Sequence, residues 1–145
     1  MTFNDVFKNK KPVIGMIHTG SSEKIPMLEL AKKEIEIYLQ YGIVPLIENY
    51  FGSADNCAEV LAWMHTAHPD MVYGVNILGD ELRAFELAHQ YGAKFIRIDS
   101  VCGHLHPKKE VPYVEQLQER REMYDVAVLG GVRFKYQPIA SGRTT

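Results

Sequence analysis

The sequence predicts an α/β fold, a partial (β/α)8 TIM barrel with about four βα units and a fifth strand. Two observations predict it. Short apolar runs bounded by Gly, Pro, Asn and Asp alternate with longer stretches in which apolar residues recur every three or four positions. The runs begin roughly 25 to 30 residues apart, the size of one βαβ crossover. A flavodoxin-like open parallel sheet is the alternative, because spacing alone does not specify how the sheet closes.

Five segments are predicted to be strands. Each is a nearly continuous run of apolar residues, rich in Val and Ile, without strict alternation of polar and apolar positions. Such runs are typical of parallel strands that are covered on both faces. The five segments are residues 12–18, 43–49, 71–78, 94–99 and 126–134.

Four helices are predicted in the connections. In residues 27–41 the apolar side chains recur at helical spacing on one side, and Gly42 is placed to end this helix. Asp80 is expected to be the N-cap of a later helix, and Pro112 to lie in the first turn of the last one. The four predicted helices are residues 27–41, 54–67, 81–91 and 112–123.

The composition is that of a globular domain. The chain has 145 residues, of which 46% are hydrophobic and 23% charged. Its formal net charge of -2 supplies no basic field for a phosphate backbone, so nucleic acid is not expected as a partner. No apolar run approaches the ~20 residues that span a bilayer, and no secretory signal is recognisable. The isolated Cys57 and Cys102 are expected to be free thiols in a reducing cytoplasm.

The length predicts an incomplete barrel. A whole (β/α)8 barrel takes about 250 residues, so a chain of 145 residues supplies a little over half of one. Residues 1–145 are therefore expected to form a single domain, the N-terminal part of a truncated barrel. Strands left unpaired at the edges of such a sheet favour pairing between chains, so a homo-oligomer is expected.

Polar residues stand at the ends of all five predicted strands. In wound parallel sheets the active site lies beyond the carboxyl ends of the strands, so these side chains are expected to meet at one mouth. We expect an enzyme that acts there on a small phosphorylated metabolite, either a sugar phosphate or a nucleoside-like compound. The candidates are His18, Glu48, Asn49, Asn76, Arg97, Asp99, Arg133 and Lys135.

Three of these residues are candidates for catalysis. His18 is either a general base or a group that binds an anion, since an imidazole changes its charge near neutral pH. Glu48 follows four apolar residues and is a general base, a metal ligand or one half of an ion pair with Arg97 or Lys135. Asp99 shares a strand face with Arg97, which predicts a carboxylate beside a fixed cation.

Four residues are candidates for binding the substrate: Asn49, Asn76, Arg97 and Lys135. The amide of Asn76 both donates and accepts hydrogen bonds, which suits it to orienting a substrate. Arg97 and Lys135 supply positive charge for an anionic group. Lys135 is also a candidate for a Schiff base, or simply points at water.

No metal or cofactor is assigned. The order Cys102-x-His104-x-His106 contains ligands that zinc prefers, but it matches no established zinc spacing, and a polar loop explains it better. The chain contains no GxGxxG, Walker, GxSxG or HExxH pattern. Dinucleotide, P-loop and serine-hydrolase chemistry therefore have no support.

Four stretches of the chain resemble, in order and spacing, the strand motifs of the BtpA/SgcQ family. The resemblance covers about the first hundred residues. Its motifs are KPVIGMIH at residues 11–18, IENYFG at 47–52, GVNIL at 74–78 and GAKFIRID at 92–99.

The resemblance implies a barrel of the ribulose-phosphate-binding type. One family member is linked to photosystem I accumulation, which implies an alternative function, that of a non-enzymatic assembly factor for a membrane protein complex. An inactive truncated fragment is the third possibility. The resemblance places candidate residues on the family's strand-end motifs, namely His18, Glu48, Asn49, Asn76 and Arg97, and places Lys135 on the lysine after the fifth strand.

Overall fold

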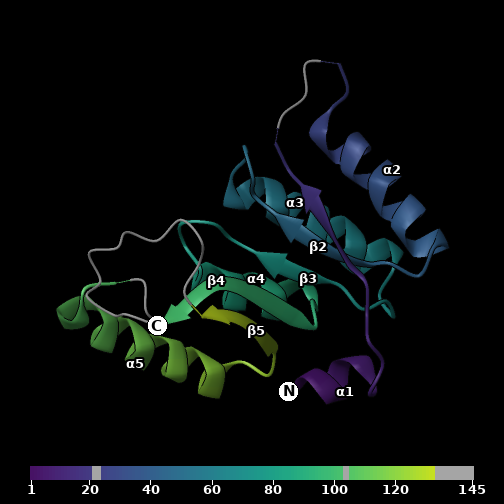
Figure 1. Cartoon of the computed structure of the whole chain (residues 1–145). Coiled ribbons are helices and arrows are strands. Elements are labelled where there is room, and N and C mark those ends of the chain that lie inside the picture. The colour runs from purple at the N-terminus through teal and green to yellow at the C-terminus, as the bar shows by residue number, and fades with distance from the viewer. Residues whose placement is uncertain (21–23, 103–104, 133–145) are drawn as a thin grey trace.

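Five parallel strands alternate with helices in the computed structural model, which describes residues 1–20, 24–102 and 105–132 (Figure 1). The sheet has the order β1-β2-β3-β4-β5, so each described strand lies beside the next one in the chain. The strands are β1 (Ile14–His18), β2 (Val44–Glu48), β3 (Gly74–Asn76), β4 (Phe95–Cys102) and β5 (Ala127–Val132). The helices are α1 (Phe3–Phe7), α2 (Met27–Gln40), α3 (Ala54–Ala67), α4 (Arg83–Tyr91) and α5 (Pro107–Met123).

Helices α2 to α5 cover a single face of the sheet. Their apolar side chains form one buried cluster with alternate strand residues, among them Ile17, Ile47, Val75 and Ile96. The alternative of a flavodoxin-like sheet requires the strand order 2-1-3-4-5 and helices on both faces. A sequential order with the crossover helices on one face is instead the arrangement of successive units in a (β/α)8 barrel. The α/β fold with a parallel sheet is therefore confirmed.

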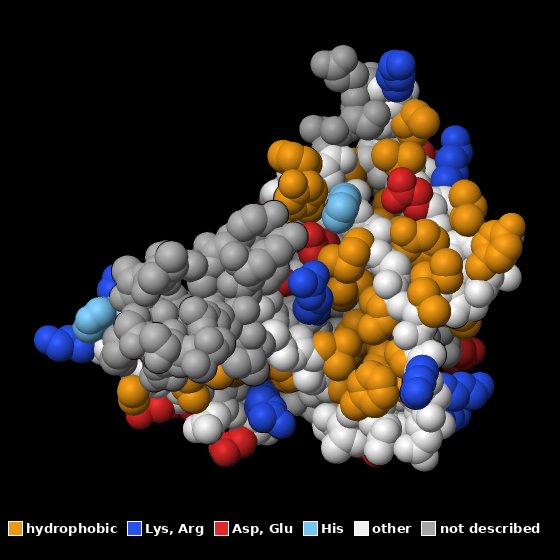
Figure 2. Space-filling view, in the orientation of Figure 1, with side chains coloured by type: hydrophobic (Ala, Val, Ile, Leu, Met, Phe, Trp, Pro, Cys, Tyr) orange, Lys and Arg blue, Asp and Glu red, His pale blue; other side chains and the backbone are white. Residues whose placement is uncertain are grey.

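The other face of the sheet is apolar near the start of the strands and polar near their ends. Close to the amino ends, α1 packs Val6 and Phe7 against Leu46, Phe95 and Ala127 in a second buried cluster. Figure 2 shows this face of the sheet, which lies opposite α2 to α5 and is covered in part by α1; hydrophobic side chains gather there over β1 and the adjoining side of α2. The polar site described below therefore lies at the end of the sheet opposite α1.

Helix α1 was not among the predicted elements. It is only five residues long, which is too short for a helical period to be visible in the sequence. A capping box holds it, because the Thr2 hydroxyl accepts from the Asp5 backbone while the Asp5 carboxylate accepts from the Thr2 backbone. Phe7 then contacts Phe95 with ring centroids 5.4 Å apart.

Two predicted helix starts were wrong. Helix α4 begins after Leu82, which makes no side-chain cap, while Asp80 accepts from the Arg83 backbone through its own carbonyl at 3.0 Å. Helix α5 begins at Pro107, so that Pro112 lies inside it rather than in its first turn. The side chain of His106 caps this earlier start by accepting from the Lys108 backbone N–H at 3.3 Å.

The sheet is open in the part of the chain that the structure describes. There, β1 pairs only with β2 and β5 only with β4. The Tyr38 hydroxyl, from α2, donates to the Met16 carbonyl at 3.1 Å.

Within the same described residues, no helix is long and apolar enough to cross a membrane.

Candidate functional site

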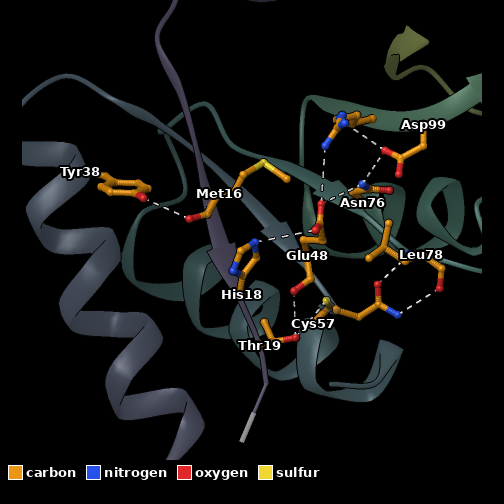
Figure 3. Close-up of polar contacts among 11 residues, drawn as sticks. Met16, His18, Thr19, Tyr38, Glu48, Cys57, Asn76, Leu78 and Asp99 are labelled. Carbon is orange, nitrogen blue, oxygen red and sulfur yellow. Dashed lines mark hydrogen bonds and ion pairs between the residues drawn. The ribbon is translucent and has the colours of Figure 1, made fainter. Parts of the chain in front are cut away.

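The register of the sheet brings the ends of three strands level. His18 lies opposite Glu48, and Glu48 lies opposite Asn76. Residues in register on parallel strands point to the same face, so these three side chains gather beyond the apolar part of the face opposite α2 to α5. Arg97 and Asp99, which are two residues apart on β4, point the same way, and Figure 3 shows the group converging.

Glu48 is at the centre of this group. Its residue is only 6% exposed. Asn76 Nδ2 donates to Glu48 Oε2 at 2.9 Å, and Arg97 Nη1 lies 3.7 Å from the same oxygen. His18 Nε2 lies 3.8 Å from Oε1, the other carboxylate oxygen. A buried carboxylate needs such partners, because removing a charge from water without compensation is costly.

Arg97 bridges two carboxylates. Its Nη2 lies 3.1 Å from Asp99 Oδ1, while its Nη1 faces Glu48. Asn76 Nδ2 is also 3.4 Å from Asp99 Oδ1, so the amide and the guanidinium connect the same two acids. These groups carry one more negative than positive charge when His18 is neutral, and protonation of His18 balances them.

Asn76 has one buried atom without a partner. The residue is 0% exposed, and its Oδ1 accepts no hydrogen bond from any described residue. An unpaired buried acceptor costs about 1–3 kcal/mol, and such atoms in folded proteins call for an explanation. A hydroxyl or N–H donor on a ligand would satisfy this oxygen.

Asn49 lies outside this group. Its Oδ1 accepts from the Leu78 backbone N–H at 2.6 Å, and its Nδ2 donates to the Leu78 carbonyl at 3.2 Å. Both polar atoms of the amide are therefore used to hold the loop after β3. The other predicted site residues, Arg133 and Lys135, lie outside the described residues.

Thr19 and Cys57 support the site from beneath, and the sequence pattern gave no indication of either. The Thr19 hydroxyl donates to the Glu48 carbonyl at 3.2 Å, and its oxygen lies 3.4 Å from Cys57 Sγ. Burial raises the pKa of the Cys57 thiol from its ordinary 9.0 to about 11. The thiol is therefore neutral at physiological pH, which makes it a poor nucleophile and a packing group.

No metal site is evident in the described part of the chain, where no group of three or more His, Cys, Asp or Glu side chains is placed to hold an ion. His104, the middle residue of the Cys102-x-His104-x-His106 pattern, is not among the described residues. Arg97 supplies the positive charge between Glu48 and Asp99. The arrangement therefore suits proton transfer and hydrogen bonding.

Comparison of the chain with models of protein families, with curated proteins and with solved structures finds no match in any of the three. The site must therefore be interpreted from its own geometry.

Proposed function

We propose that the protein is a cytoplasmic enzyme that acts on a small phosphorylated metabolite, a sugar phosphate or a nucleoside-like compound, at the carboxyl ends of β1 to β4. One observation carries the proposal. Glu48 is a buried carboxylate that side chains from three strands contact: His18 from β1, Asn76 from β3 and Arg97 from β4. Titratable groups that converge at a strand-end mouth are what an acid–base site requires.

Glu48 and His18 would form the acid–base pair. The His18 side chain is 52% exposed and Glu48 nearly enclosed, so the imidazole reaches solvent or substrate while the carboxylate stays fixed. Their 3.8 Å separation is longer than a hydrogen bond, as catalytic contacts often are before the substrate binds. Asp99 serves as the alternative acid or base, since its side chain is 20% exposed.

Binding would depend on the groups around this pair. Asn76 Oδ1 would accept from a substrate hydroxyl or N–H. Arg97 holds Glu48 and Asp99 in position and faces the mouth with a side chain that is 36% exposed. Lys135 keeps its proposed role as the cation for a phosphate group.

A thermal-shift screen against sugar phosphates and nucleotides tests this function. We expect at least one compound to raise the unfolding temperature of the wild-type protein, and Glu48→Gln to abolish that shift. Glu59→Gln is the matched control, because Glu59 is an exposed carboxylate on α3, which covers the opposite face of the sheet. No shift with any compound, or the same shift in Glu48→Gln, would contradict the proposal.

A second function, non-enzymatic assembly of a membrane protein complex, is favoured by one observation. Hydrophobic side chains gather over β1 and the adjoining side of α2, and exposed apolar patches commonly mark interaction surfaces (Figure 2). A cellular role that survives Glu48→Gln but is lost when Ile37, which is 52% exposed on α2, is changed to Asp would support this function over the enzyme.

A further inference from the structure

Three aromatic rings follow one another from the loop after β2 to the site. Phe51 contacts Tyr50 with ring centroids 4.2 Å apart, and Tyr50 contacts His18 at 5.0 Å. His18 in turn lies 3.8 Å from Glu48. The aromatic pair Tyr50–Phe51 is therefore connected to the carboxylate site through a single side chain.

Two independent observations show that Phe51 has an energetically unfavourable conformation. Its side chain is 84% exposed, although an aromatic ring gains most from burial. Its φ of 56° lies in the left-handed region, which residues other than glycine rarely adopt. Backbone strain of this kind concentrates at ligand-binding sites, where the bound state repays it.

The surrounding backbone fixes Phe51 in this state. A Cβ on Gly52 would lie 2.3 Å from the Thr19 carbonyl oxygen, so only glycine permits the two loops to approach this closely. Asn56 Nδ2 also donates to that carbonyl at 3.1 Å, and the Gly52 N–H donates to the Asn49 carbonyl at 2.9 Å. The backbone at Phe51 is therefore held in the conformation that leaves its ring beside Tyr50.

The aromatic pair borders a hollow of about 770 Å³ between β1 and α2. This volume is in the range of small-molecule sites. Leu30 and Ile37 line it with apolar residues, and Glu34 is the one carboxylic acid among the described residues that line it. The Tyr38 hydroxyl, also at the hollow, is already engaged with Met16.

We propose that this hollow, with the aromatic pair Tyr50–Phe51, binds the base of a nucleotide. The inference rests on the proposed function and selects the nucleoside-like class of substrate over the plain sugar phosphate. A nucleobase offers two apolar faces for stacking on aromatic rings and N–H groups that Glu34 accepts. A ribose ring offers only a small C–H face to such rings, so a plain sugar phosphate would cover less of the aromatic and apolar lining than a planar base does. The ribose and phosphate would then extend past His18 toward Asn76.

Calorimetric titration of the full chain with matched ligands tests the proposal. Adenosine, guanosine and uridine 5′-monophosphates are compared with ribose 5-phosphate, which lacks only the base. We expect at least one nucleotide to bind about fivefold or more tightly than ribose 5-phosphate, the gain typical of one stacked base. In an NMR spectrum the protons of the bound base should shift upfield, because they lie over aromatic rings.

Phe51→Gly separates binding from stability. Glycine adopts a φ of 56° without strain, which offsets its higher unfolded-state entropy and the lost ring contact, so this variant should unfold close to the wild-type temperature while its nucleotide affinity falls toward that of ribose 5-phosphate. Tyr41→Leu is the control. Tyr41 is an aromatic residue at the C-cap of α2, it is 78% exposed, and it does not line the hollow. Its nucleotide affinity should equal that of the wild type.

Three outcomes would overturn the proposal. If ribose 5-phosphate binds as tightly as every nucleotide and Phe51→Gly changes nothing, the base site is refuted while the proposed function stands. If no compound binds, both are refuted. A third outcome combines three results: the wild-type protein self-associates, Phe51→Gly abolishes that association, and no nucleotide binds. The hollow would then be an interface between copies of the chain.

Discussion

Asn76 Nδ2 donates to Glu48 Oε2 at 2.9 Å, whereas Asn76 Oδ1 is buried without a partner among the described residues. The amide thus donates to the carboxylate through one atom, while its other polar atom is buried with its hydrogen-bonding capacity unused.

Asn76→Asp should destabilise the protein in a pH-dependent way. Two carboxyl groups would then lie about a hydrogen-bond length apart and share a proton, because both cannot stay ionised in a buried site. The folded variant binds that proton more tightly than the unfolded chain does, so its stability falls as pH rises. We expect urea unfolding to show a loss of about 1–3 kcal/mol near pH 7.5. The loss should be clearly smaller near pH 5, and an equal loss at the two pH values would contradict the interpretation.

Arg97→Met should destabilise the folded protein more than Arg97→Lys does. Methionine leaves Glu48 and Asp99 without the guanidinium that lies 3.7 Å from one and 3.1 Å from the other. Because the Arg97 side chain is partly exposed, we expect a loss of about 1–3 kcal/mol for Met, below the cost of breaking a fully buried pair. Lysine keeps the charge but contacts only one carboxylate well. Chemical denaturation measures both variants, and equal losses would show that Arg97 does not bridge the acids.

Cys57 should make the stability of the protein fall at alkaline pH. Its folded-state pKa is raised from 9.0 to about 11, so between these values the folded protein retains a proton that the unfolded chain releases. The contribution of this thiol to the free energy of unfolding is complete below pH 9 and declines as the pH rises toward 11. The decline is at most about 1.4 kcal/mol per pH unit. Cys57→Ala should lower overall stability yet remove this part of the slope. Cys102→Ala, the control, should keep it.

Tyr38→Phe should increase self-association. The hydroxyl of Tyr38 satisfies the Met16 carbonyl, and its removal leaves an open acceptor beside the unpaired edge of β1. Edge strands with free backbone groups pair with other chains. We expect a stability loss of about 0.5–1.5 kcal/mol and a larger weight-average mass in sedimentation experiments, with wild type itself forming a homo-oligomer. A monomeric wild type and an unchanged mass in the variant would contradict this.

Periodicity alone was enough to locate most of the fold. The predicted strands and helices agree with the structure within a few residues in most cases, because apolar spacing reports which side chains face the core. The start of α5 is one exception, and the predicted strand 71–78 is another, since only Gly74–Asn76 pair as β3. Of its other apolar residues, Tyr73 and Ile77 are each buried at 1% exposure without belonging to the strand, whereas Met71 is 40% exposed.

The site could be predicted in part. Strand ends and the two-residue repeat identified Glu48 and the Arg97–Asp99 pair, and the structure brings these side chains together. Asn49 stands next to Glu48 in the sequence, yet it bonds Leu78, because the position of the loop after β3 is a tertiary feature. The left-handed backbone of Phe51 was equally hidden, since glycine is the usual signal for that conformation.

The most direct test of a ligand site centred on Glu48 is an NMR titration of the isotope-labelled chain with ribose 5-phosphate and the three nucleoside monophosphates. We predict that the side-chain amide of Asn76 shifts, together with backbone amides at the carboxyl ends of β1 to β4, and that Glu48→Gln weakens or removes these shifts. Shifts confined to α1 and the amino ends of the strands, or no shifts at all, would contradict the account.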